Sequence, residues 1–274
     1  MTISPEAHAA LTARYGAAAP DEILWNETLA AMLDHRSVRA FTAEPLPDAV
    51  LPTLIAAAQS AATSSNLQTW SVVAVRDPQR KAELANLAGD QAQIRECPLF
   101  LVWLADLARL ADVAAARELP HDALDYTEML LVAAIDATLA AQNAAVAAAS
   151  LGLGTVYIGA MRNRPLDVAR VLGLPPRTFA VFGLCVGWPD PARPTAVKPR
   201  LPHSAVLHDE QYQTDQTTVV AAYNAEMAEF YASQQMQVRG DWAEHSAKRV
   251  AGPQALSGRD VLRAMLNERG FALR

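Results

Sequence analysis

The sequence has few cysteines, few aromatic residues and no excess of positive charge, and each shortage excludes a class of protein. Two cysteines in 274 residues, Cys97 and Cys185, cannot form a disulfide framework. Both lie in apolar runs, a usage typical of a reducing cytoplasm. Aromatic residues make up 6% of the chain and its net charge is -6. A general nucleic-acid binder, which needs a basic surface or a stacking platform, is therefore not expected.

Recognisable catalytic motifs are also missing. The six histidines show no metal-ligand spacing, so no metal site is predicted. The chain contains neither a Walker loop nor a Gly-x-Ser-x-Gly elbow. Carboxylates near one another, such as Asp122 and Asp125, are typical of solvated helix positions. Without an acid–base or nucleophilic set, the pattern favours chemistry carried by a cofactor.

No segment of the chain is predicted to be a leader or a linker. Residues 1–34 carry charges throughout and lack a continuous apolar core, so no secretory signal is expected there. The best candidate for a membrane span is 129–153, but Asp136, Gln142 and Asn143 interrupt it. Its many alanines indicate a buried, closely packed helix instead, and no membrane partner is expected.

Short apolar runs alternate with amphipathic segments along the chain. Strands are predicted at 70–76, 98–105, 155–158 and 179–187. Helices are predicted at 25–34, 48–61, 78–88, 123–150, 164–172, 217–233 and 257–269. Apolar strands separated by helices indicate a sheet covered on both faces, an α/β or α+β layered sandwich.

Two basic segments are candidates for binding a phosphate. If His35-Arg36-Ser37-Val38-Arg39 is extended, Val38 faces the apolar layer and its neighbours face the other way. A hydroxyl between cations is suited to a phosphate monoester, although a solvated basic corner has the same composition. Lys198-Pro199-Arg200 is either a solvated loop or, if it lies near Ser37 in space, the second side of that site.

Two further segments could contact a flat polar ligand. Residues 63–68, Thr-Ser-Ser-Asn-Leu-Gln, join a helix to a strand and offer hydroxyl and backbone N–H groups, as an ordinary turn also would. The glycines of 152–154 follow a helix and precede a strand, the reverse of a Rossmann motif. Gly159 and Ala160 at the strand end would let the backbone approach a ring closely.

Taken together and in this order, these segments resemble the nitroreductase superfamily of FMN-dependent oxidoreductases. The match is nearest to its oxygen-insensitive NADPH nitroreductase and flavin reductase group, with further matching blocks at 89–91, 141–144 and 182–189. The resemblance implies an α+β three-layer sandwich with a central mixed sheet flanked by helices, and a homodimer with intertwined subunits. It also implies an N-terminal extension at 1–32 and one FMN-dependent nitroreductase-like domain at 33–274.

The resemblance implies FMN as cofactor and NADPH or NADH as reductant. The expected activity is two-electron, ping-pong reduction of nitroaromatics, quinones or similar small acceptors, with the flavin rather than a side chain carrying the chemistry. Two alternatives stay open. One is a flavin reductase that supplies reduced FMN to a partner, and the other is a flavin-binding storage or sensing protein without turnover.

Site residues follow from the resemblance by position. The phosphate end of FMN is expected to contact His35, Arg36, Ser37, Lys198 and Arg200. Arg39 would reach the N1/O2 end of the ring, where a permanent cation stabilises the negative charge of reduced flavin. The partner subunit would supply residues of the 63–68 loop, and the ring would also contact Gln91 and the end of the third strand, with the Gly159 N–H near N5. The residues implied in the loop are Thr63, Ser64, Ser65 and Gln68. Those implied at the end of the strand are Tyr157, Ile158, Gly159 and Ala160.

Coenzyme choice is where this chain departs from the resemblance. In the nitroreductase and flavin reductase group, an arginine binds the NADPH 2′-phosphate. The stretch that contains this arginine corresponds here to 233–242. The arginine position is Gln234 in this chain, and the nearby cation is Arg239. Since Gln234 carries no charge, the sequence predicts a weak preference between NADPH and NADH.

Overall fold

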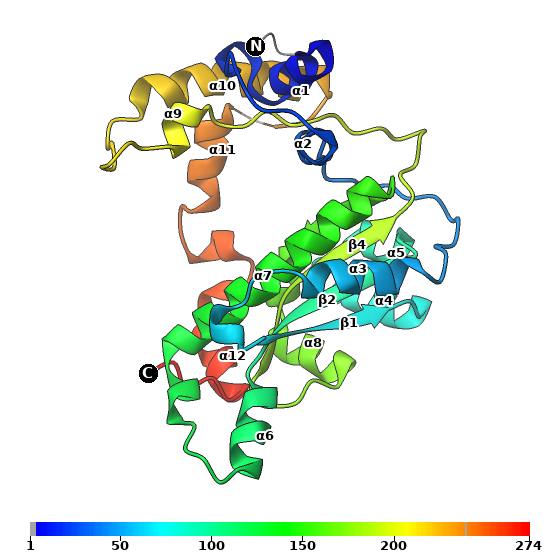
Figure 1. The fold of residues 1–274 in the computed structure, drawn as a ribbon, viewed down its shortest axis with the longest axis vertical. Coiled ribbons are helices and arrows are strands. Elements are labelled where there is room, and N and C mark those ends of the chain that lie inside the picture. The colour runs from blue at the N-terminus through cyan, green and yellow to red at the C-terminus, as the bar shows by residue number, and fades with distance from the viewer. Residues whose placement is uncertain (1–3, 239) are drawn as a thin grey trace. The chain divides into compact units, whose positions relative to one another are not determined.

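The computed structural model describes residues 4–238 and 240–274, which form two compact units (Figure 1). The helical unit comprises the chain up to Arg36 together with Thr195–Leu256. The sheet unit comprises Ser37–Pro194 and Ser257–Arg274. The domain boundaries inferred from the sequence, 1–32 and 33–274, stay a prediction.

The sheet unit is built on four antiparallel strands in the order β1-β2-β4-β3. Their bounds are Trp70–Val75 for β1, Leu99–Asp106 for β2, Gly154–Ile158 for β3 and Thr178–Gly187 for β4. The mixed sheet implied by the resemblance is thus antiparallel in these strands. Parallel pairing is confined, among the described residues, to an isolated bridge between Ser37 and Thr155 at the β3 edge.

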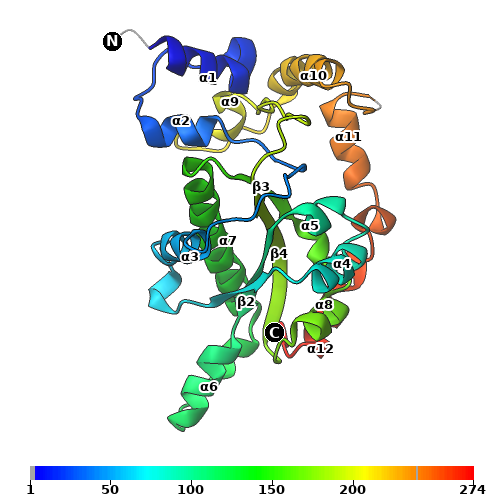
Figure 2. The same ribbon diagram turned by 90° about the vertical axis from the view of Figure 1, so that its right-hand side faces the viewer.

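Helices cover both faces of the sheet (Figure 2). Side chains of β2 alternate in direction, so Leu99, Leu101 and Trp103 pack against α3 (Val50–Gln59) and α7 (Thr127–Ser150). Phe100, Val102 and Leu104 belong to the opposite core, with α4 (Pro78–Leu87), α5 (Ala92–Glu96) and α8 (Pro165–Leu172). This arrangement confirms the expected three-layer α+β sandwich.

The long helix α7 packs on the sheet through alanines. Seven alanines and Asp136 are its buried residues, and small side chains let a helix approach a sheet closely. By length and hydropathy alone the helix could cross a membrane. Its other side exposes Leu131, Ile135 and Leu139, which lie four residues apart and so share one face.

The helical unit contains α1 (Pro5–Tyr15), α2 (Glu27–Leu33), α9 (His203–Val206), α10 (Thr217–Ser233) and α11 (Trp242–Arg249). Side chains of Ser4, Asn26 and Asp241 cap α1, α2 and α11 by accepting hydrogen bonds from first-turn N–H groups. Its apolar core is centred on Tyr223, Met227 and Tyr231 of α10.

Most elements lie where the sequence predicts them, and the differences are local. The long helix begins at Thr127 rather than 123, after a 3₁₀ turn at Asp122–Asp125. The C-terminal helix expected at 257–269 is shorter, because Gly258 has φ +82° and a 3₁₀ turn precedes α12 (Leu262–Glu268). Among the described residues, helices α1, α5, α9 and α11 were not predicted, nor was α6 (Ala108–Ala116) in full.

Candidate functional site

The first basic segment and the basic loop are joined by Arg14 of α1. The Arg14 guanidinium donates to the carbonyl of Leu33 at 2.7 Å, that of His35 at 2.7 Å and that of Lys198 at 2.9 Å. The Arg14 carbonyl in turn accepts from the Arg200 N–H at 2.8 Å. We call Arg14, His35, Lys198 and Arg200 the basic cluster; all four belong to the helical unit.

The electrostatics of the basic cluster favour an anion. Burial lowers the pKa of His35, and the charges of Arg14, Arg200 and Arg36 lower it further, outweighing the opposite effect of Asp34. Burial and Arg200 likewise lower the pKa of Arg14. The fall in both pKa values shows that burial and the neighbouring cations outweigh the effect of Asp34 at these two residues. This donor set therefore fits a phosphate dianion, which charge-assisted hydrogen bonds hold strongly.

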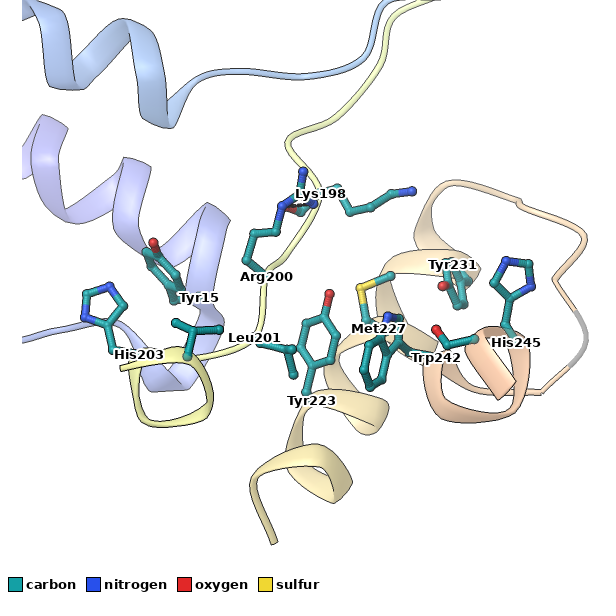
Figure 3. A pocket seen from close by; sticks show the side chains of 12 residues that line it. Tyr15, Lys198, Arg200, Leu201, His203, Tyr223, Met227, Tyr231, Trp242 and His245 are labelled. Carbon is teal, nitrogen blue, oxygen red and sulfur yellow. Dashed lines mark hydrogen bonds between the residues drawn. The ribbon is translucent and has the colours of Figure 1, made fainter. Parts of the chain in front are cut away.

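The basic loop is also fixed from α10. The Tyr223 hydroxyl donates to the Pro199 carbonyl at 2.9 Å, and the Lys198 Nζ lies 6.0 Å from the centre of the Phe230 ring. Lys198 and Arg200 line a cavity of about 520 Å³. Figure 3 shows both residues among the side chains that line it. Aromatic and basic side chains line much of it: Tyr15, Tyr223, Tyr231, Trp242, His203 and His245.

In the sheet unit, residues 37–39 run along the β3 edge as the extended pattern predicts. The Val38 N–H donates to the Thr155 carbonyl at 2.9 Å, and the Val38 side chain is buried. A side chain at Gly154 would place its Cβ 2.7 Å from the Val38 Cβ, so glycine is required for this close approach. Arg39 is exposed, which leaves its guanidinium accessible to a ligand.

The loop from Thr63 to Thr69 is organised by the buried carboxylate of Asp136. That carboxylate accepts from the Thr63 hydroxyl at 2.5 Å, the Ser64 N–H at 3.1 Å and both the N–H and the hydroxyl of Thr69 at 3.0 and 2.9 Å. Ser65 and Gln68 have positive φ, of 47° and 52°, a conformation that such residues adopt only when their surroundings impose it. The loop therefore has a conformation fixed by Asp136 and is not an ordinary turn.

At the end of β3, the backbone of Gly159 lies next to the side chain of Arg162. Ile158 is buried, while the 3₁₀ turn Gly159–Arg162 begins directly after it, and a Cβ at Gly159 would lie 3.3 Å from the Arg162 Nη2. Tyr157 donates from its hydroxyl to the Gln142 Oε1 at 3.3 Å, and burial raises the pKa of Tyr157 to about 12. The Tyr157 hydroxyl therefore stays protonated at neutral pH, and its hydrogen bond to Gln142 orients the tyrosine ring.

Gln91 lies in a turn beside this strand end. A Cβ at Gly89 would lie 3.9 Å from the Asn163 Nδ2, which places the 89–91 turn next to the Gly159–Arg162 turn. Gln91 precedes α5, and its Oε1 accepts from the Gln93 Nε2 at 2.6 Å. The contact of the structure is thus between Gly89 and Asn163, two residues before Gln91 and directly after the Gly159–Arg162 turn.

The residues expected to read the coenzyme are the least defined. Gln234 directly follows α10 and is exposed, and Arg239 lies outside the described residues. Sequence reasoning also missed Arg14 and treated Asp136 as an interruption of an apolar helix. A lone carboxylate on the alanine-rich face of α7 was the available signal for Asp136, since a buried charge needs partners.

Comparison with known proteins places the chain in a family. The model of the nitroreductase family matches residues 32–188, and that of the nitroreductase family C-terminal domain matches 198–274. The chain therefore belongs to the nitroreductase family. It is 38% identical to the NADPH-flavin oxidoreductase of Vibrio harveyi over 250 residues, 91% of this chain and 100% of that one.

A further relative and a solved structure agree with this assignment. The oxygen-insensitive NADPH nitroreductase of Salmonella typhimurium is 36% identical over 248 residues, covering 90% of this chain and 99% of the relative. A solved structure of NADPH:FMN oxidoreductase from Vibrio harveyi complexed with NAD⁺ has a TM-score of 0.81 and 37% identity, over 91% of this chain and 100% of that one. These similarities confirm the group inferred from the sequence.

Proposed function

We propose that the protein is an FMN-dependent NAD(P)H oxidoreductase that reduces nitroaromatics, quinones or similar small acceptors. The observation that carries the proposal is the basic cluster, whose gathered positive charge suits the phosphate of FMN, in a chain of the nitroreductase family. Bound FMN supplies the redox chemistry, taking a hydride from NAD(P)H and passing two electrons to the acceptor in a ping-pong cycle.

The phosphate end is assigned to the two basic segments. His35, Arg36 and Ser37 approach it from one segment, and Lys198 and Arg200 from the other. Arg14 and Tyr223 hold the loop backbone in place, so the cationic side chains are positioned before the ligand arrives. Pre-positioned cations contribute binding free energy because less side-chain entropy is lost on binding.

The ring end is assigned to residues of the sheet unit. Exposed Arg39 provides a permanent positive charge for the N1/O2 side. Tyr157, Ile158, Gly159 and Ala160 would lie along the ring with the Gly159 N–H toward N5, where the 3₁₀ turn Gly159–Arg162 begins, and Gln91 would contact the same ring. A fixed backbone donor orients the ring for hydride transfer without needing an acid or base.

The loop shaped by Asp136 is assigned to the flavin of a second subunit. Thr63, Ser64, Ser65 and Gln68 would line that site, so the active species is a homodimer. The exposed stripe of Leu131, Ile135 and Leu139 on α7 supports this assembly, because a row of apolar side chains on one helix face is suited to contact with an equivalent row. Two buried free cysteines, Cys97 and Cys185, suit a cytoplasmic location.

Purified protein with its visible spectrum tests the function. We expect a yellow dimer that binds FMN and is bleached by NADPH and NADH with similar efficiency, because Gln234 stands at the family's arginine position and Arg239 is the neighbouring cation. A colourless protein that does not bind added FMN contradicts the proposal. Rapid loss of FMN from the reduced protein would favour the flavin reductase alternative, and stable binding without NAD(P)H oxidation would favour storage or sensing.

The phosphate assignment has its own test. Replacing Lys198 and Arg200 together by Ala should weaken FMN binding at least a hundredfold, since charge-assisted bonds contribute about 1.5–3 kcal/mol each. Binding of riboflavin, which lacks the phosphate, should change little. An unchanged FMN affinity in equilibrium dialysis would show that the basic loop is only a solvated surface.

A further inference from the structure

The helix that carries Arg14 lies outside the part of the chain that the family describes. The family models begin at residue 32 and α1 spans Pro5–Tyr15. The relative from Vibrio harveyi is matched over its whole length by 91% of this chain. Neither family model covers α1, so its role follows from its own contacts in this chain.

Both ends of helix α1 are fixed by contacts within the helical unit. Ser4 caps its start by accepting from the Ala7 N–H, and Gly16, with φ +53°, ends it. The positive φ of Gly16 is a conformation that glycine adopts without strain, and the Glu226 carboxylate of α10 lies beside it, 2.5 Å from where a Cβ would be. The Tyr15 ring packs edge-on against His203 with centroids 5.0 Å apart. These contacts fix the end of the helix where Arg14 lies.

Arg14 connects the backbones of the two basic segments that are assigned to the phosphate. Only 5% of the residue is exposed, although it is charged. Two of its three acceptors, the carbonyls of His35 and Lys198, belong to residues assigned to the phosphate, and its own carbonyl fixes the Arg200 N–H. A planar guanidinium can serve several carbonyls at once, which an ammonium on a flexible stem does less well.

The charge of Arg14 is not neutralised by an ion pair in the part of the chain that the structure describes, so it can act on a ligand. Its hydrogen-bond acceptors are carbonyls, and among the described residues no carboxylate lies within ion-pair distance of it. A buried cation satisfied only by dipoles keeps its full charge and raises the local positive potential. Burial is the main cause of the lowered pKa of His35, and the charge of Arg14 lowers that pKa further, so the potential of Arg14 acts at a residue of the phosphate segment.

We propose that Arg14 is a positioning residue for the phosphate of the flavin, and that α1 is thereby part of the cofactor site of this chain. The proposal rests on the proposed function, because it takes FMN as the ligand. Arg14 acts through the backbone of residues 35 and 198 and through its charge, without itself contacting the phosphate.

The test compares two flavins on the full-length apoprotein. Dissociation constants of FMN and riboflavin are measured by flavin fluorescence for the parent, Arg14→Met, Arg14→Lys and the control Arg117→Met, which removes an exposed positive charge on the sheet unit. We expect Arg14→Met to weaken FMN at least tenfold and riboflavin less than twofold. Arg14→Lys should recover part of the loss, because it keeps the charge but not the planar fork. Arg117→Met should match the parent.

The ratio of the two dissociation constants separates positioning from general damage. An unchanged ratio in Arg14→Met overturns the proposal, whether the variant binds both flavins normally or both equally poorly through misfolding. Arg14→Lys gives a second measurement if Arg14→Met is unstable, and an unchanged ratio there with weakened binding of both flavins has the same meaning. If the parent itself binds riboflavin as tightly as FMN, the phosphate site of the proposed function fails first, and the role of Arg14 falls with it.

Discussion

The carboxylate of Asp136 is predicted to be the main support of the loop at residues 63–69. It is 1% exposed and accepts four hydrogen bonds from three residues of that loop. In Asp136→Asn a single carbonyl oxygen remains. If it takes the Oδ2 position it still accepts from Thr63 and Thr69, but the Ser64 N–H then faces an amide NH₂ group. The substitution preserves shape and removes one acceptor and the charge.

The expected cost follows from these contacts. Losing a charge-assisted bond to the Ser64 N–H costs about 1.5–3 kcal/mol, and the remaining bonds weaken from charged to neutral strength. Burying a neutral amide in place of a carboxylate offsets part of this loss. We therefore expect the free energy of unfolding to fall by about 2–4 kcal/mol.

Chemical denaturation of the apoprotein measures this change, with Asp112→Asn on the exposed side of α6 as the matched control. Because the loop is assigned to the flavin ring, binding of FMN and riboflavin should weaken together, unlike in the Arg14 variants. Unfolding within about 0.5 kcal/mol of the parent, the range of an ordinary surface change, would refute the account of the loop.

Three other changes test separate parts of the structure. Arg39→Ala should lower the midpoint potential of the FMN-saturated protein, since about 1–3 kcal/mol of anion stabilisation is lost; spectroelectrochemistry that gives an equal or higher potential would place Arg39 away from N1/O2. The pKa of His35 is lowered in the folded protein, so the unfolded chain binds the proton more readily, and apoprotein stability should fall as pH drops below about 6.5. His35→Gln should flatten that part of the stability profile, and an unchanged slope would contradict the assignment. Ile135→Asp should dissociate the proposed dimer in sedimentation at micromolar concentration, while Val113→Asp, an equally exposed position on α6, should not; a dimer of unchanged stability in the first variant would exclude the α7 stripe from the interface.

The layered fold was predictable because its information is local. Alternation in β2 separates Leu101 from Val102 onto opposite faces, and the sequence shows that apolar run directly. The extended course of residues 37–39 followed from the same reasoning, and Val38 is buried as expected. Elements without a strong apolar period were missed. Helix α1, for example, buries Ala7, Leu11 and Arg14, a pattern that alanine-rich composition hides.

The supports of the site were not predictable because their partners lie far apart in the chain. The bond from Arg14 to Lys198 spans 184 residues, and the bond from Thr63 to Asp136 spans 73. Each support is a buried charge whose role depends on which backbone groups surround it, and no spacing rule encodes that. The family resemblance supplied the residues expected to face the ligand, through the ordered blocks of the sequence, but it supplied neither Arg14 nor Asp136.

The overall charge of the chain gives the wrong expectation for the ligand, and the basic cluster explains why. A net charge of -6 suggests that a phosphate dianion would be repelled. Interactions beyond about 10 Å are largely screened at physiological salt, so a ligand at the site responds to the nearest charges. There Arg14, His35, Lys198 and Arg200 are gathered, and Asp34 is already paired with Arg36. Because Arg14 is satisfied by carbonyls, helix α1 adds a positive charge to the site without adding a carboxylate to cancel it. A buried arginine on a segment outside the family models can therefore raise affinity for an anionic cofactor while every ligand-facing residue stays the same.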